Sequence, residues 1–284
     1  MMTSQFYHFQ CGGFLCTSVS DGGHFYQLAH MFANVPLEQV TQALSQHGLP
    51  TDHFFTPYTC LYVNTGSHHI LVDMGGGDVM PNAGKLRENL IASGVEPSQI
   101  DTILITHAHP DHIGGTATSE GELLYPNAHY FIWHKEWDFW RSDLAVEIAP
   151  MRHVTLARER LAYLEGRVTL IEPGTEIVPG VRGIDAAGHT PGHMALSFVS
   201  EGTQLIHISD TVLSPLHLEH PDWLPVFDIL PDEAAVSKQR LFNQASSDKA
   251  LVFAHHFLPF PNIGYIAKHG IGWEWRPVQV SIST

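Results

Sequence analysis

The sequence predicts an α/β fold, an αββα sandwich in which two mixed β-sheets are flanked by helices. Two observations favour it. Many short segments have the apolar character of strands, and segments with helical periodicity are interspersed among them. The 284 residues contain no long linkers, repeats or low-complexity tracts, and 44% of them are hydrophobic. We therefore predict one domain, residues 1–284, with a substantial core.

Strands dominate the first hundred residues. Segments 12–20 and 59–73 are typical of strands, the second divided by a turn at 65–67. Residues 84–93 have the apolar spacing of a helix that ends before Gly94. The run DTILIT at 101–106 is typical of a strand buried on both faces.

The second half alternates in the same way. Its expected elements are a strand at 128–134, helical structure over 135–165 with a break near Pro150, strands at 167–172 and 181–186, a hairpin over 195–210, a helix over 232–246 with Asp232 as its N-cap, and a buried strand at 249–256.

The stretch THAHPDH, residues 106–112, overlaps the end of the buried strand at 101–106. It places His107, His109, Asp111 and His112 in six positions. His107 and His109 are two apart, so in an extended segment they project to the same side. The pair His107 and His109 can bind one metal ion while the pair Asp111 and His112 binds a second. Loops at the carboxyl ends of buried strands are where open α/β sheets place their chemistry, so a merely solvated loop is a poor explanation.

Further candidate ligands follow later strands. His189 in GHTPGH is one candidate, while His193 in the same motif is either a ligand or a group that braces the loop. Asp210 ends the segment HISD and is placed to bridge two cations. Because neighbours alternate faces in a strand, only one of His255 and His256 is expected in the site, and we favour His256.

Together these motifs resemble the metallo-β-lactamase fold superfamily, from about residue 13 to about 275, with a complete HxHxDH signature. LVDMGGGD, KEWDFW and HHFLPFPNIGYI further resemble the branch of methyl parathion hydrolase and the N-acyl homoserine lactonases. The resemblance implies a first metal held by His107, His109 and His189, a second held by Asp111, His112 and His256, and a bridge at Asp210.

Two departures from that pattern stand out. Leu258 looks inserted between the terminal histidine and the PFP tripeptide, which keeps His255 as an alternative to His256. The GxGH ending of relatives is 262–265 here, where Tyr265 either contacts substrate or packs. Some lactonases also carry a tyrosine just after the bridging aspartate, where this chain has Thr211.

The ligand chemistry predicts two divalent metal ions. Imidazole and carboxylate ligands suit Zn²⁺ and tolerate Mn, Fe or Co. Seven candidates without cysteine fit an open two-metal site better than a closed structural zinc. Two such ions roughly 3.5–4 Å apart lower the pKa of a shared water toward about 7. Asp111 and Asp210 are the predicted catalytic residues, Asp111 as a proton shuttle.

The resemblance implies hydrolysis of an apolar lactone or related ester, like an N-acyl homoserine lactone. Phosphotriester or aryl-ester hydrolysis and glyoxalase II-like thioester hydrolysis are alternatives on the same site. A mononuclear-iron oxygenase and a non-enzymatic metal-binding protein are further hypotheses. One iron per chain would favour the oxygenase.

The aromatic residues near the expected mouth offer an apolar pocket for an acyl chain or aryl group, although most are expected to pack in the core. They are Phe25, Tyr26, Trp133, Trp137, Phe139, Trp140, Phe257 and Phe260. Asp73, at the end of its strand, is expected to orient a ligand histidine. Residues 75–77, all glycine, favour a tight turn beneath the site over a phosphate cradle, because no Lys-Ser/Thr pair follows.

Composition restricts the partners. A formal net charge of −15 argues against nucleic acid and anionic membranes, which would be repelled. No apolar run approaches the roughly 18 residues of a membrane span, and no secretory signal is evident. Three cysteines without metal-type spacing favour the cytoplasm. Apolar residues of the N-terminal segment and of the tail GWEWRPVQV are a possible homodimer contact.

Overall fold

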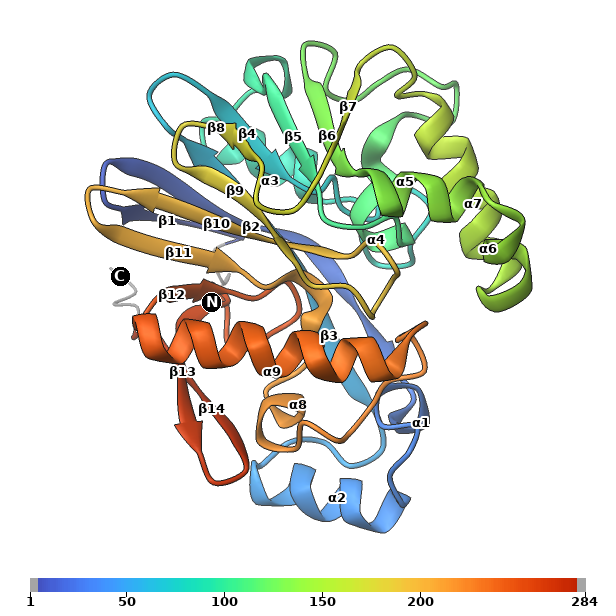
Figure 1. Cartoon of the computed structure of the whole chain (residues 1–284), viewed down its shortest axis with the longest axis vertical. Coiled ribbons are helices and arrows are strands. Elements are labelled where there is room, and N and C mark those ends of the chain that lie inside the picture. Colours follow the sequence, from blue (N-terminus) through green and yellow to red (C-terminus); the bar gives the residue numbers. More distant parts are fainter. Residues whose placement is uncertain (1–4, 280–284) are drawn as a thin grey trace.

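The structure is a computed structural model that describes residues 5–279. Over that range the chain forms two seven-stranded sheets with helices outside them (Figure 1). The first sheet follows chain order: β1 (Phe6–Cys11), β2 (Phe14–Tyr26), β3 (Phe54–Asn64), β4 (His69–Val72), β5 (Thr102–Ile105), β6 (His129–Trp133) and β7 (Val168–Ile171).

The second sheet is built from the rest of the chain. Its spatial order, from one edge to the other, is β14 (Gly272–Pro277), β13 (Ile263–His269), β12 (Leu251–Phe253), β11 (Thr203–His207), β10 (Met194–Ser200), β9 (Val181–Asp185) and β8 (Glu176–Val178). Both sheets are mixed: β4 through β7 pair in parallel and so do β11 and β12, whereas the other neighbours are antiparallel. The predicted αββα sandwich is confirmed.

Helices cover the outer faces of both sheets. Within residues 5–279 the α-helices are α1 (Leu28–Met31), α2 (Leu37–Gln46), α3 (Leu86–Ala92), α4 (Pro110–Ile113), α5 (His134–Arg141), α6 (Asp143–Ile148), α7 (Met151–Ala162), α8 (Leu216–Glu219) and α9 (Pro231–Asp248). Helices α3, α5 and α7 pack on the first sheet, and α9 packs on the second (Figure 1).

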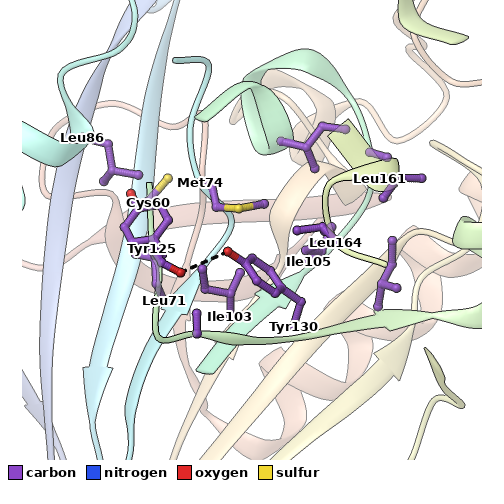
Figure 2. Close-up of a cluster of buried hydrophobic side chains, with 14 of the residues drawn as sticks. Cys60, Leu71, Met74, Leu86, Ile103, Ile105, Tyr125, Tyr130, Leu161 and Leu164 are labelled. Atoms are coloured by element: carbon purple, nitrogen blue, oxygen red, sulfur yellow. Dashed lines mark hydrogen bonds between the residues drawn. The ribbon is translucent and has the colours of Figure 1, made fainter. Parts of the chain in front are cut away.

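The apolar side chains of β5 divide between two core layers. Ile103 and Ile105 join the cluster under α3, α5 and α7, where Tyr130 donates a hydrogen bond to the Tyr125 carbonyl oxygen (Figure 2). Leu104 points the other way, into the layer shared with the second sheet. This strand is therefore buried on both faces, as its uninterrupted apolar run predicts.

Several elements differ from the sequence-based expectation. The helical stretch after β6 breaks at Ser142 as well as at Pro150, because the Ser142 hydroxyl caps α6. Asp232 is not the N-cap of α9, which is Leu230, since Pro231 takes the first helical position. The strand expected at 249–256 is only β12, Leu251–Phe253, and residues 255–256 form a turn.

The elements that the sequence did not predict lie mostly at the edges of the molecule. They are β1, β8, β13, β14, α1, α2 and α8, together with the single-turn helix α4 at the site itself. In the tail, Trp273 and Trp275 pack into the cluster under α9 rather than at the surface. They therefore offer no exposed dimer contact, and a homodimer stays a prediction. Within residues 5–279, every helix is too short or too polar to cross a bilayer.

The two sheets meet directly beside the predicted site. Thr106, which follows β5, accepts a hydrogen bond through its carbonyl oxygen from Met194 N–H at the start of β10. Its hydroxyl oxygen accepts another from the Ser209 hydroxyl beyond β11. These contacts hold the loops after β5, β9 and β11 against one another.

Candidate metal centre

The motif 106–112 forms a buried loop followed by the single-turn helix α4. Pro110 stands at the first helical position, where its missing N–H costs nothing. His107, His109 and His112 are buried, and Asp111 is 9% exposed and lines a cavity. The loop therefore presents its polar side chains inward.

One group of ligand atoms joins this loop to the loop after β9. His107 Nε2 lies 3.1 Å from His109 Nδ1, which lies 2.9 Å from His189 Nε2. Ligand atoms of these three residues all lie within 4.8 Å of one another. Three buried imidazole nitrogens thus converge from two different sheets.

A second group lies beside the first. Ligand atoms of Asp111, His112 and His256 fall within the same 4.8 Å limit, and so does one atom of His255. His256 Nε2 is 3.6 Å from Asp111 Oδ2. His112 Nε2 is 3.8 Å from the same carboxylate oxygen.

Asp210 stands between the two groups. Its Oδ2 is 3.9 Å from His107 Nε2 and 3.4 Å from His189 Nε2. The same oxygen is 3.0 Å from His256 Nε2, and Oδ1 is 3.1 Å from His112 Nε2. A single carboxylate therefore faces histidines of both groups.

Hydrogen bonds on the outer side fix which ring nitrogen carries the proton in three of the histidines, His112, His189 and His256. His112 Nδ1 donates to Asp73 Oδ2 at 2.8 Å, His189 Nδ1 to Asp228 Oδ1 at 2.9 Å, and His256 Nδ1 to the Pro57 carbonyl oxygen at 2.9 Å. With the proton on Nδ1, each Nε2 lone pair points into the cluster. The donor set therefore fits metal ions.

The electrostatics of the cluster also favour cations. Burial and neighbouring histidines hold the pKa values of His107 and His109 well below the usual value, so both rings stay neutral with lone pairs free. Burial alone would lower the pKa of His112, but the carboxylates of Asp210, Asp73 and Asp111 raise it well above its usual value. Neutral His107 and His109 thus lie beside carboxylates whose charge is strong enough to favour the protonated form of His112, which is the setting that a bound cation needs.

His255 and His256 point in different directions. His256 aims Nε2 at Asp210, whereas the His255 ring stacks on His112 at 4.2 Å between centroids. Among residues 5–279, neither ring nitrogen of His255 has a hydrogen-bond partner. The geometry favours His256 as the residue facing the site.

Two expected supporting roles agree with the geometry. Asp73 also accepts from Thr106 N–H at 2.8 Å, so it ties the start of the motif to His112. His193 donates through Nδ1 to the Ala186 carbonyl oxygen, and its Nε2 accepts from Asp210 N–H at 3.1 Å. His193 thus braces the loop that carries Asp210. The glycines at 75–77 form a turn beneath the motif, where Gly115 N–H donates to the Gly75 carbonyl oxygen.

The sequence analysis missed the two carboxylates that hold the loop around His189. Asp228 accepts from His189 and pairs with Lys238 Nζ at 3.0 Å. Burial alone would raise the pKa of Asp228, but the His189 hydrogen bond and the Lys238 charge lower it overall. Glu136, completely buried in α5, accepts from Ala108 N–H at 2.8 Å and from Gly192 N–H at 3.1 Å.

A cavity of about 410 Å³ opens above the cluster, a size suited to a small ligand. Of the aromatic residues expected at the mouth, Tyr26 lines this cavity, together with Phe227, which the sequence did not indicate. Trp133, Phe139, Trp140 and Phe257 are instead buried in core clusters, whereas Phe25 is 57% exposed and does not line this cavity. The remaining walls come mainly from His24, Met31, Met80, Arg152, His153 and Leu213.

The family model described as "Metallo-beta-lactamase superfamily" matches residues 54–256, which contain the whole cluster. The chain belongs to this superfamily. An N-acyl homoserine lactonase of Bacillus cereus is 26% identical over 226 residues, covering 70% of this chain and 81% of the relative. A beta-lactamase-like protein 2 homolog of Drosophila melanogaster is 29% identical over 181 residues, covering 63% of this chain and 55% of the relative.

Two solved structures superpose over nearly the whole chain. AidC, a dizinc quorum-quenching lactonase in complex with the product N-hexanoyl-L-homoserine, has a TM-score of 0.92 at 25% identity, covering 98% of this chain and 99% of AidC. The hydrolase AbOPH of the beta-lactamase superfamily has a TM-score of 0.91 at 28% identity, covering 99% of this chain and all of AbOPH. The predicted family and fold are confirmed, and the protein is a metal-dependent hydrolase of this superfamily.

Proposed function

We propose that this protein is a dinuclear-metal hydrolase that opens lactones of the N-acyl homoserine type or cleaves closely related esters. The observation that carries the proposal is Asp210, whose two oxygens face histidines of both ligand groups. The names of the lactonase of Bacillus cereus and of AidC support the choice of substrate.

In this proposal each group would hold one divalent ion, for which zinc is favoured. His107, His109 and His189 would hold the first, Asp111, His112 and His256 would hold the second, and Asp210 would serve both. Two cations so placed supply Lewis acidity and lower the pKa of water to near neutrality.

The residues of the chain perform the remaining tasks. Asp111 lines the cavity, so its carboxylate can take up the proton released when water attacks the substrate. Met31, Leu213 and Phe227 give the cavity an apolar wall that suits an acyl chain. Arg152 adds a guanidinium to the same cavity, a group suited to the carboxylate that ring opening releases.

Metal analysis combined with lactone hydrolysis tests the proposal. Wild type and Asp210→Ala would be assayed for metal by elemental analysis and for ring opening of an N-acyl homoserine lactone by pH-stat. Asp248→Ala, at an exposed carboxylate that ends α9, is the matched control. We expect about two metal ions per chain and ring opening in wild type and control, and loss of both in Asp210→Ala.

Other results would redirect the assignment. Two metals without lactone opening would refute the lactonase function and point to aryl phosphotriesters or thioesters. A single iron per chain would refute the seven-ligand assignment and favour an oxygenase.

A further inference from the structure

Tyr26 and Tyr58 form a pair of hydroxyl groups at the edge of the cavity. They lie on adjacent antiparallel strands, β2 and β3, and their Oη atoms are 2.7 Å apart. The Tyr26 ring is held edge-on between His24, at 4.9 Å between centroids, and Phe227, at 5.5 Å. All three of these rings line the cavity, so the Tyr26 hydroxyl has a fixed place in its wall.

The direction of the hydrogen bond in this pair follows from burial. Tyr58 is completely buried, and within residues 5–279 its hydroxyl has a single hydrogen-bond partner, Tyr26 Oη. A buried hydroxyl that did not donate would leave a polar hydrogen unpaired away from water, which is costly. Tyr58 therefore donates and Tyr26 accepts. Within residues 5–279 the Tyr26 hydroxyl has no second hydrogen-bond partner, so its proton is available to a molecule in the cavity that Tyr26 lines.

The donor is close to the cluster. Asp111, Asp210 and His256 line the same cavity as Tyr26. The Tyr58 ring is in edge contact with the His256 ring, at 5.6 Å between centroids. His256 also donates through Nδ1 to the carbonyl oxygen of Pro57, the residue before Tyr58. The same short segment of β3 therefore positions both His256 and the hydroxyl pair.

We propose that Tyr26 donates a hydrogen bond to the carbonyl oxygen that is attacked in the bound lactone, and that Tyr58 is the residue that positions it. The inference rests on the proposed function and adds a substrate-contacting residue to it. A neutral hydroxyl in a partly apolar cavity needs an acceptor, and the lactone carbonyl oxygen is one. The bond strengthens as negative charge develops on that oxygen, so it favours the transition state over the ground state.

Two conservative variants separate this role from simple packing. Tyr26→Phe removes the donor and keeps the ring contacts with His24 and Phe227. Tyr58→Phe removes only the hydroxyl that positions Tyr26. Tyr7→Phe, in β1 and outside the cavity, controls for loss of a tyrosine hydroxyl elsewhere. Each variant would be assayed on an N-acyl homoserine lactone and on the same five-membered lactone without the acylamino group.

We expect Tyr26→Phe to lower kcat/KM by about tenfold to a hundredfold, mainly through kcat, because one transition-state hydrogen bond is lost. The loss should be equal on both lactones, since both share the ring carbonyl. Metal content and unfolding midpoint should match wild type. Tyr58→Phe should lose less activity, because Tyr26 keeps its hydroxyl, and Tyr7→Phe should lose none.

Several outcomes would overturn the proposal. Activity of Tyr26→Phe within twofold of wild type would mean that the ring only packs. A greater loss in Tyr58→Phe, or metal loss in Tyr26→Phe, would assign the pair to the structure of the site. A loss confined to the acylated lactone would place the hydroxyl on the amide instead of the ring carbonyl. If the wild type opens neither lactone, the proposed function fails, and the Tyr26 assignment fails with it.

Discussion

Removing the carboxylate of Glu136 should separate the two loops that carry the first group of ligands. Its Oε1 accepts from Ala108 N–H and from Trp140 Nε1–H at 2.6 Å. Its Oε2 accepts from the Thr190 hydroxyl at 2.6 Å and from Gly192 N–H. One side chain thus joins the loop of His107 and His109 to the loop of His189.

The size of the effect follows from these four bonds. A buried donor left without an acceptor costs about 1–3 kcal/mol, so Glu136→Ala should destabilise the fold by at least about 4 kcal/mol. Glu136→Gln is the more informative change. Its amide oxygen can still accept from Ala108 and Trp140, and the Thr190 hydroxyl can turn to accept. Only Gly192 N–H would then face an amide N–H₂ group and lose its acceptor. We therefore expect Glu136→Gln to lower the free energy of unfolding by about 1–3 kcal/mol.

Urea unfolding and metal titration would measure both consequences. Glu165→Gln is the matched control, because Glu165 is an exposed carboxylate paired with Arg141 and should contribute less than about 1 kcal/mol. We expect Glu136→Gln to be less stable than the control variant. It should also bind more weakly the metal ion assigned to His107, His109 and His189. If the two variants are equally stable and bind metal equally well, the bridging role assigned to Glu136 is wrong.

Three further predictions concern residues around the cluster. Asp73→Asn should weaken metal binding about tenfold to a hundredfold, because His112 loses the carboxylate that fixes its proton, and unchanged affinity by competition with a chelator would contradict this. His256→Ala should lose one metal per chain by elemental analysis whereas His255→Ala should keep both, and the reverse result would make His255 the ligand. Burial raises the pKa of Asp21 to about 6, above the unfolded value, so the folded state binds this proton more tightly. Wild type should therefore lose stability relative to Asp21→Asn as pH rises from about 4 to about 6. A difference in unfolding free energy between the two proteins that stays constant over that range would exclude the raised pKa of Asp21.

The parts of the site that could be predicted from the sequence are those set by local geometry. His107, His109, Asp111 and His112 follow an apolar run, and such a run marks a strand buried on both faces. Asp73 could be predicted in the same way, because it directly follows a neighbouring strand. What these residues share is that their placement depends on a strand end and not on a distant contact.

The supporting carboxylates depend on distant contacts, so local patterns do not reveal them. Asp228 meets His189 from a loop that has no strand or helix signature. Glu136 did leave a signal: with Phe139 and Trp140, three and four residues later, it lies on the buried face of α5. A carboxylate on such a face needs donors, but the sequence does not say that they are Ala108 and Gly192.

Strands at the edges of the sheets were missed for a related reason. β13 and β14 form a hairpin in which Trp273 and Trp275 alternate with Glu274. That alternation is typical of a strand with one buried face. The buried face became evident only once α9 was placed against it, because the tail alone is too short to indicate which side is covered.

The joining of the two sheets around Thr106 has a consequence for how the protein is made. His107 and His109 leave the ribosome well before His189, Asp210 and His256, the groups that they face in the finished fold. Synthesis proceeds from the N-terminus, so a nascent chain that has completed the first sheet carries only part of the cluster. Metal loading should therefore be a late event in biogenesis, and a ribosome-stalled chain ending before β9 should not retain the ions of the full-length protein.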